Sequence, residues 1–303
     1  MDTFLPIRVR WDVDFHGQAA RVKRIARKVA EVCPRFVELR ISGDQGVSEL
    51  PGICAELQKC SPGITVTIGL FPGAESATRW GYPVEFIWDV GALGGFAGRL
   101  PGGARAVAFV PEEGTIGELP EIVSEFSESS IRELHLPHVN AVRAVAARGH
   151  VPVPGIDQLR EAAETVASLG VTLEGKRVVA HDFFLWRELR GRFPAAVGDR
   201  VEFAGCEAGS ALAFIDWKGN VYPCDALPIR LGNLEEASLE EIWRSPARER
   251  VVAAIQASPD PFDACGENRG CLGGCRGMVF PGTETSRRPD PACPMPTESG
   301  SSV

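Results

Sequence analysis

The sequence of 303 residues contains no apolar stretch long enough to span a bilayer, which argues against an integral membrane protein. It also lacks a basic excess. Its net charge is −8, whereas a non-specific nucleic-acid binder needs a basic surface to displace counterions. The glycine-rich stretch 91–98 has neither G-x-G-x-x-G spacing nor a following Lys-Ser/Thr pair, so it predicts no phosphate-binding loop. We therefore expect neither a membrane nor a nucleic acid as partner.

Residues 1–10 show no charged segment followed by an apolar one, so the sequence predicts no export signal. This favours a reducing cytoplasm, where clustered cysteines hold metal more often than they form disulfides. The chain contains 9 cysteines, and an odd number fits a disulfide framework poorly. We therefore expect a cytoplasmic protein whose cysteines bind metal.

Most of the cysteines lie in the last hundred residues, with the spacing C-x12-G-x4-C, then C-x5-C-x3-C, then a final cysteine before proline. Each stands beside glycine, proline or another turn residue, as ligation needs, because the backbone must bend tightly around a compact metal centre. The candidate metal ligands are Cys206, Cys224, Cys265, Cys271, Cys275 and Cys293. The other three, Cys33, Cys54 and Cys60, are spaced too irregularly for a ligand set, and we expect buried structural thiols.

The first two hundred residues alternate short β-like runs with amphipathic helical stretches. The predicted strands span 7–15, 36–42, 65–71, 84–90, 105–110 and 131–136, and the predicted helices span 19–32, 50–58, 116–126, 156–169 and 183–189. Such alternation indicates βα units and a largely parallel sheet. We expect an α/β fold whose residues 1–200 form a partial (β/α) barrel.

After residue 200 the pattern changes to a small cysteine-rich domain, predicted at 201–296. A turn at 216–220 separates two short strands and indicates a β-hairpin. Ser238 and Glu241 form a predicted capping box at the start of a short helix. From residue 258 onward apolar residues are too sparse to order the chain by burial, so bound metal would supply folding free energy. We expect the tail 297–303 to be disordered.

These features together resemble a known domain. The run FIDWKGNVYPCD at 214–225, followed by LGNL at 231–234, SLEEIW at 238–243, Cys271-x3-Cys275 and DPACP at 290–294, closely resembles the SPASM domain. That domain is the C-terminal extension of radical SAM enzymes that modify peptides and proteins, and it carries auxiliary 4Fe–4S clusters. The resemblance implies one or two such clusters here, with zinc as the alternative, because thiolate sites also satisfy zinc.

The family pattern has seven cysteines, and Phe262 stands where its third would be. By position, the resemblance assigns one cluster to Cys206, Cys224 and Cys275 and the other to Cys265, Cys271 and Cys293. Each set then needs a fourth ligand, such as a water, a partner group or an aspartate oxygen. Asp260 and Asp263 lie close to the missing cysteine in the sequence.

The N-terminal half departs from the family. A radical SAM enzyme carries C-x3-C-x2-C after its first strand, but the corresponding positions are His16, Ala20 and Lys23. The Gly-Gly-Glu-Pro segment that helps to bind S-adenosylmethionine (AdoMet) appears as GDQG at 43–46. The resemblance therefore implies a degenerate radical SAM barrel, kept as a scaffold or docking surface, that neither binds nor cleaves AdoMet.

This combination resembles the SPASM-domain protein of the GeoRSP system, which implies action beside a catalytic radical SAM/SPASM protein. We expect an iron–sulfur accessory subunit that relays electrons or positions a substrate peptide for that partner, with no catalytic residue of its own. One alternative is a structural adaptor whose metal only folds the C-terminal region. Another is an enzyme that uses an open cluster iron as a Lewis acid, although the sequence shows no convergent base.

Overall fold

The structure, a computed structural model, describes residues 5–14, 19–41, 49–60, 62–69, 84–91, 100, 103–257, 271, 274–275, 277–278, 290 and 292–293. Its strands are β1 (Arg8–Val13), β2 (Phe36–Ile41), β3 (Gly63–Gly69), β4 (Val84–Asp89), β5 (Ala106–Ala108), β6 (Glu133–Leu136), β7 (Arg177–Ala180), β8 (Val201–Phe203), β9 (Leu212–Ile215), β10 (Asn220–Tyr222) and β11 (Gly232–Asn233). The expected tail at 297–303 lies outside the described residues.

The helices are α1 (Ala19–Glu31), α2 (Leu50–Leu57), α3 (Leu119–Glu128), α4 (Ala141–Arg148), α5 (Ile156–Ser168), α6 (Phe183–Arg192), α7 (Ala195–Gly198), α8 (Leu239–Trp243) and α9 (Pro246–Gln256). Short 3-10 turns follow α2 at Gln58–Cys60 and precede α3 at Ile116–Glu118. Within the described part of the chain, none of the helices combines the length and the apolar character that crossing a membrane requires.

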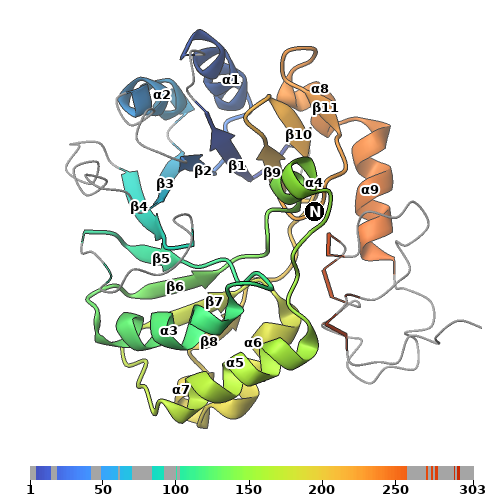
Figure 1. Ribbon diagram of the computed structural model, residues 1–303. Coiled ribbons are helices and arrows are strands. Elements are labelled where there is room, and N and C mark those ends of the chain that lie inside the picture. The colour runs from blue at the N-terminus through green and yellow to red at the C-terminus, as the bar shows by residue number, and fades with distance from the viewer. Residues whose placement is uncertain are drawn as a thin grey trace, which may run out of the picture.

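All the described strands join one 11-stranded sheet in the order β11-β10-β9-β1-β2-β3-β4-β5-β6-β7-β8. Strands β1 to β8 follow one another in chain order and pair in parallel. Figure 1 shows them as an open arc, with α1 and α2 outside its first strands and α3, α5 and α6 outside its last. The predicted α/β class and partial (β/α) barrel are confirmed.

The outer face of the arc is apolar, because alternate residues of a strand point to opposite faces. In β1, Val9, Trp11 and Val13 are almost fully buried on that face. Helix α1 meets this core with the positions that its helical period predicts, namely Val22, Ile25, Ala26 and Val29. Full burial of such side chains contributes about 1.5–3 kcal/mol each. The inner face of the arc is therefore left to the other residues of each strand.

The sheet continues into the cysteine-rich region without a break. Strand β9 pairs in parallel with β1, and β10 returns antiparallel to β9 as the predicted hairpin. Helix α8 begins at the predicted capping box: Ser238 Oγ accepts the N–H of Glu241 (3.2 Å), and Glu241 Oε2 accepts the N–H of Ser238 (2.8 Å). One sheet thus carries both the barrel and the hairpin that precedes Cys224.

Candidate metal centre

The β9–β10 hairpin determines where Cys224 lies. Its turn is organised by Asp216, whose Oδ1 accepts the N–H groups of Lys218 (2.8 Å) and Asn220 (2.9 Å). The other oxygen accepts the side-chain amide of Asn220 (2.8 Å) and the hydroxyl of Tyr222 (3.2 Å). Aspartate often closes turns in this way, because its side chain mimics a backbone acceptor. The hairpin delivers Cys224 two residues beyond the end of β10.

Cys224 lies near two other predicted ligands. Burial raises the pKa of its thiol well above the usual value, and the charges of Asp225, Cys275 and Cys206 raise it further. Thiolates that oppose one another's ionisation are neighbours, and a bound cation would reverse this effect. Cys206 and Cys275, the other members of the first predicted set, therefore lie within electrostatic range of Cys224.

These three thiols suit the predicted cofactor by chemistry, since thiolates are the usual ligands of iron–sulfur clusters and of zinc. Searching the described residues alone, we find no three His, Cys, Asp or Glu side chains already at the spacing of bound metal ligands. The role of these cysteines as ligands stays a prediction.

The second predicted set is described only in part. Cys271 and Cys293 are half-buried and pack against the hydrophobic core, where Ala292 is fully buried. Cys265, Phe262, Asp260 and Asp263 lie outside the described residues, as do His16 and segment 43–46. The assignment of this set to a metal also stays a prediction.

In the family, three cysteines hold the AdoMet-binding cluster. Two of the corresponding positions in this chain, Ala20 and Lys23, are described, and both lie on α1. Ala20 is exposed, and Lys23, with 45% of its side chain exposed, lies 3.9 Å from the carboxylate of Glu49. Neither side chain is a thiol, so neither can ligate a cluster iron as cysteine does.

The other cysteines differ from expectation in one respect. Cys54 is buried, as predicted, but Cys33 is exposed and Cys60 is only half-buried. Cys33 follows the end of α1 with a left-handed φ of 46°, which turns it out of the helical face. Its thiol donates to the backbone oxygen of Ala30 at 3.4 Å. Burial was expected for Cys33 as for the other two thiols, but α1 ends two residues before it, at Glu31.

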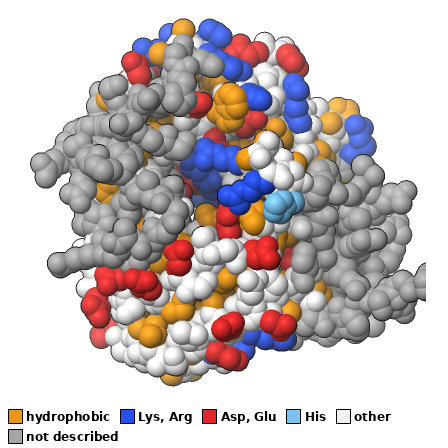
Figure 2. Space-filling model, viewed as in Figure 1, with side chains coloured by type: hydrophobic (Ala, Val, Ile, Leu, Met, Phe, Trp, Pro, Cys, Tyr) orange, Lys and Arg blue, Asp and Glu red, His pale blue; other side chains and the backbone are white. Residues whose placement is uncertain are grey.

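Sequence reasoning missed a ring of charges on the inner face of the barrel. Arg10 donates from Nε to Glu38 (2.7 Å) and from Nη1 to Asp225 (2.9 Å). Arg40 contacts the same two acids, Glu38 at 2.9 Å and Asp225 at 2.6 Å. Figure 2 shows Lys and Arg side chains gathered near the middle of this view, inside the arc of strands. Asp225 thus joins the residue after Cys224 to β1 and β2.

The ring fixes the ionisation of its members. Burial alone would raise the pKa of Asp225, but the charges of Arg10 and Arg40 outweigh it and hold the pKa below the usual range. Glu38 behaves in the same way, with Arg10 and then Arg40 lowering its pKa against the effect of burial. Both acids therefore remain ionised, and each of the four charges touches two of opposite sign.

Helix α4 closes over the ring from the inner side. Arg143 contacts Asp12 at 2.6 Å, and the Asn140 amide donates to the same carboxylate at 3.1 Å. The N–H of Val142 donates to the backbone oxygen of Asp225 at 3.1 Å. Asp12 is fully buried, and among the residues that the structure describes its Oδ1 finds no hydrogen-bond partner. The inner face of β1 and β2 is thus filled by side chains of the protein itself.

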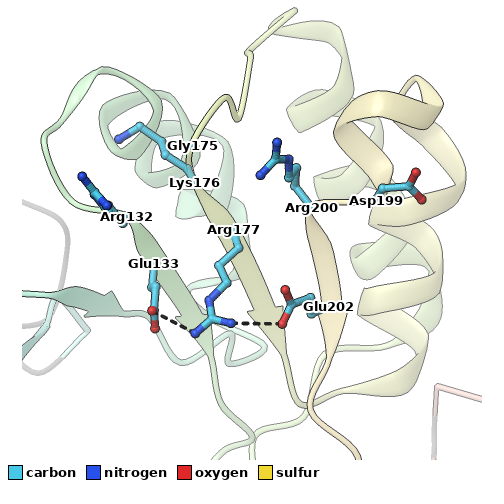
Figure 3. Close-up of a pocket in the computed structure, with 8 residues that line it drawn as sticks. All are labelled: Arg132, Glu133, Gly175, Lys176, Arg177, Asp199, Arg200 and Glu202. Carbon is cyan, nitrogen blue, oxygen red and sulfur yellow. Dashed lines mark hydrogen bonds and ion pairs between the residues drawn. The ribbon is translucent and has the colours of Figure 1, made fainter.

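A cavity of about 370 Å³ lies elsewhere, at the N-terminal ends of β6, β7 and β8. Figure 3 shows Arg177 between two acids in this cavity, with Glu133 at 2.9 Å and Glu202 at 3.4 Å. The pairs continue from Glu133 to Arg105 at 3.1 Å. In barrels of this kind functional sites lie at the opposite ends of the strands. We therefore assign this cavity no part in the candidate site.

Comparison with known proteins bears on this arrangement. Residues 206–272 match the family model of SPASM, an iron-sulfur cluster-binding domain. That match contains Cys206, Cys224, Cys265 and Cys271, whereas Cys275 and Cys293 lie beyond its end.

Curated relatives include two enzymes named AdoMet-dependent heme synthase. That of Methanosarcina barkeri is 28% identical over 89 residues, or 29% of this chain and 25% of the relative. That of Oleidesulfovibrio alaskensis is 32% identical over 92 residues, or 29% of this chain and 23% of the relative. The chain therefore spans about a quarter of the length of the curated relatives it matches.

Solved structures match over nearly the whole chain. Native anSMEcpe with bound AdoMet and Cp18Cys peptide has a TM-score of 0.59 and 12% identity, covering 95% of this chain and 94% of that one. The form with Kp18Cys peptide has a TM-score of 0.60 and 12% identity, covering 94% of each chain. At this identity the match concerns the fold. The matched domain, the partial relatives and the fold together support a place for the chain in the radical SAM/SPASM superfamily.

Proposed function

We propose that this protein is an iron–sulfur accessory subunit of a radical SAM system that matures a peptide or protein. In this proposal it does not itself cleave AdoMet, and it relays electrons or positions substrate for a catalytic radical SAM/SPASM partner in the cytoplasm. One contrast carries the proposal. Cys206 and Cys275 lie within electrostatic range of Cys224, in a region with the SPASM cysteine spacing, whereas the three positions of an AdoMet-binding cluster hold histidine, alanine and lysine.

The inner face of the barrel supports the same reading. Arg10, Glu38, Arg40 and Asp225 satisfy one another there, and α4 covers them, so this surface is engaged by the protein's own groups. A barrel without the cysteines of the AdoMet-binding cluster still provides a large folded surface on which a partner could dock. The GeoRSP SPASM-domain protein, which the chain resembles, likewise combines a SPASM domain with a barrel that lacks the C-x3-C-x2-C motif.

The names of the relatives and of the solved structures mention AdoMet. These proteins are named as AdoMet-dependent, or are seen with bound AdoMet, whereas this chain lacks the cysteines for an AdoMet-binding cluster. We therefore assign to this chain the cluster-binding part of the system and assign AdoMet cleavage to the partner. Bound clusters would supply one-electron transfer, with potentials determined by ligation and exposure.

Anaerobic reconstitution tests the proposal. The purified protein should take up iron and sulfide, show a cluster EPR signal after reduction, and form no 5′-deoxyadenosine from AdoMet. Formation of 5′-deoxyadenosine by the chain alone would contradict the accessory role. Binding of zinc with no iron under the same conditions would contradict electron relay.

One observation favours the structural adaptor as a second candidate. Ala292 is fully buried, and Cys271 and Cys293 pack against the same core, so a metal there would help to fold the C-terminal segment. Replacing Cys271 by serine separates the two functions. Loss of thermal stability with full activity of the catalytic partner favours the adaptor, whereas loss of that activity favours the accessory subunit.

A further inference from the structure

Asp290 lies three residues before Cys293 and has only 2% of its surface exposed. Its Oδ1 accepts the N–H of Ala292 at 2.9 Å, and its backbone oxygen accepts the N–H of Cys293 at 2.8 Å. This is the turn that aspartate forms when its side chain bonds to the backbone two residues later. The carboxylate therefore fixes Ala292, the residue before Cys293, and the Asp290 backbone fixes Cys293 itself.

The other carboxylate oxygen reaches a distant segment. Asp290 Oδ2 accepts the N–H of Cys275, 15 residues earlier in the chain, at 3.1 Å. Gly274 makes this approach possible, because a Cβ at that position would lie 2.3 Å from Asp290 Cβ. Gly274 also has a φ of +82°, a conformation that other residues rarely adopt. The contact between the two segments therefore depends both on the Asp290 carboxylate and on the glycine at position 274.

We propose that Asp290 is a positioning residue that holds the two predicted cysteine sets together. One carboxylate fixes Cys275, which the family resemblance assigns to the first cluster, beside Cys293, which it assigns to the second. The inference rests on the proposed function, since it takes both cysteines as cluster ligands. Asp290 itself is not assigned as a ligand, because a backbone N–H already engages each of its oxygens.

Thiol alkylation of the full-length, metal-free protein tests this role without any cluster. Asp290→Asn keeps the size of the side chain but offers one acceptor oxygen for two N–H groups, and Asp290→Ala offers none. We expect iodoacetamide to modify Cys275 and Cys293 faster in both variants, by about tenfold in the alanine variant, the equivalent of one lost hydrogen bond. Peptide mass spectrometry measures both rates.

Two controls identify a general loss of structure. Cys54 is buried in the barrel, and its rate should not change if the variants remain folded. Asp216→Asn disturbs another buried aspartate turn of the same region and should leave Cys275 and Cys293 at their wild-type rates. If the Asp290 variants expose Cys54, Gly274→Ala provides the second test. It keeps the carboxylate but pushes it away, and should raise both rates as well.

Iron release from the reconstituted protein gives the second readout. A chelator should remove iron faster from Asp290→Asn than from wild type, and the EPR signal should change, because ligands of both clusters lose their fixed position. Wild-type alkylation and iron release in all variants would overturn the positioning role and leave the proposed function standing. If the wild type takes up no iron, the proposed function fails, and the alkylation rates still decide the role of Asp290.

Discussion

Two groups of charged residues lie on the inner face of the same sheet, and one is buried whereas the other is open to solvent. On β1 and β2, Arg10, Glu38 and Arg40 form a buried ring with Asp225, in which the side chains are 5–19% exposed. Across β4 to β8, alternating charges form an open row of Glu85, Arg105, Glu133, Arg177 and Glu202. Arg105 and Glu202, near its ends, are 47% and 50% exposed.

The difference in burial determines how much stability each group loses when one of its charges is removed. A buried charge that loses its partner cannot be rescued by water, whereas an exposed one is solvated at little cost. The ring includes Asp225, the residue after Cys224, so it connects the candidate metal centre to the barrel. The row connects neighbouring strands to one another.

Asp225→Asn should have the largest effect. It leaves Arg10 and Arg40 buried with a single carboxylate between them, and breaking a buried pair costs about 3–5 kcal/mol. Urea unfolding of the variant should show this loss. A loss below about 1 kcal/mol, as for an exposed pair, would show that the ring is no different from the row.

Glu38→Gln should rank second. Glu38 also contacts both arginines, but its side chain is 19% exposed, so water partly replaces it. We expect a loss of about 2 kcal/mol, typical of hydrogen bonds to charged groups. The same urea experiment measures it. An equal loss in Glu38→Gln and Asp225→Asn would mean that the contact of Asp225 with the barrel adds no extra stability.

Glu133→Gln should cost about 1 kcal/mol, since the side chains of its arginine partners are 41% and 47% exposed. A hydrogen bond from His135 outweighs burial and, with Arg105 and Arg177, lowers the pKa of Glu133 from 4.5 to about 2. A lowered pKa stabilises the fold above pH 4.5, and this stability is lost as the pH falls towards 2. The difference between wild type and variant should therefore be constant from pH 7 to 5 and shrink below 4.5. A constant difference down to pH 3 would contradict this account.

Glu202→Gln should have the smallest effect, below about 0.5 kcal/mol, because a half-exposed ion pair contributes little. It has one arginine partner, Arg177, at 3.4 Å. High salt should abolish even this difference through screening. Unfolding curves at low and high ionic strength measure it, and a salt-resistant loss above 1 kcal/mol would place Glu202 with the ring.

Local signals predicted much of the fold. The helical period placed α1, and the Ser238 capping box placed α8, because both depend on residues close in sequence. Helix α4 was missed, although Asn140 caps its start and Gly149 ends it in a left-handed conformation. Attention to caps would have found it, since its apolar pattern is weak. Strand β7 was also missed, since its sequence RVVA shows no alternation of apolar and polar residues.

The candidate site was likewise predicted only in part from the sequence. Cysteine spacing predicted a set of candidate ligands, since the flanking turns are local, and two of them lie within electrostatic range of Cys224. The ring was missed because Arg10 and Asp225 are 215 residues apart, and no local pattern predicts their contact. Charged residues at alternate positions of β1 and β2 were the one available signal. They indicate a strand whose inner face is polar.

The pairing of β9 with β1 has a consequence for biosynthesis. About 200 residues separate the two strands, and ribosomes add about 5–20 residues per second, so β1 waits some 10–40 s for this neighbour. During that interval one edge of β1 has no partner strand, and Arg10 has no Asp225. The N-terminal half therefore cannot reach its final state as it emerges, and chaperones that shield open strand edges should associate with the nascent chain.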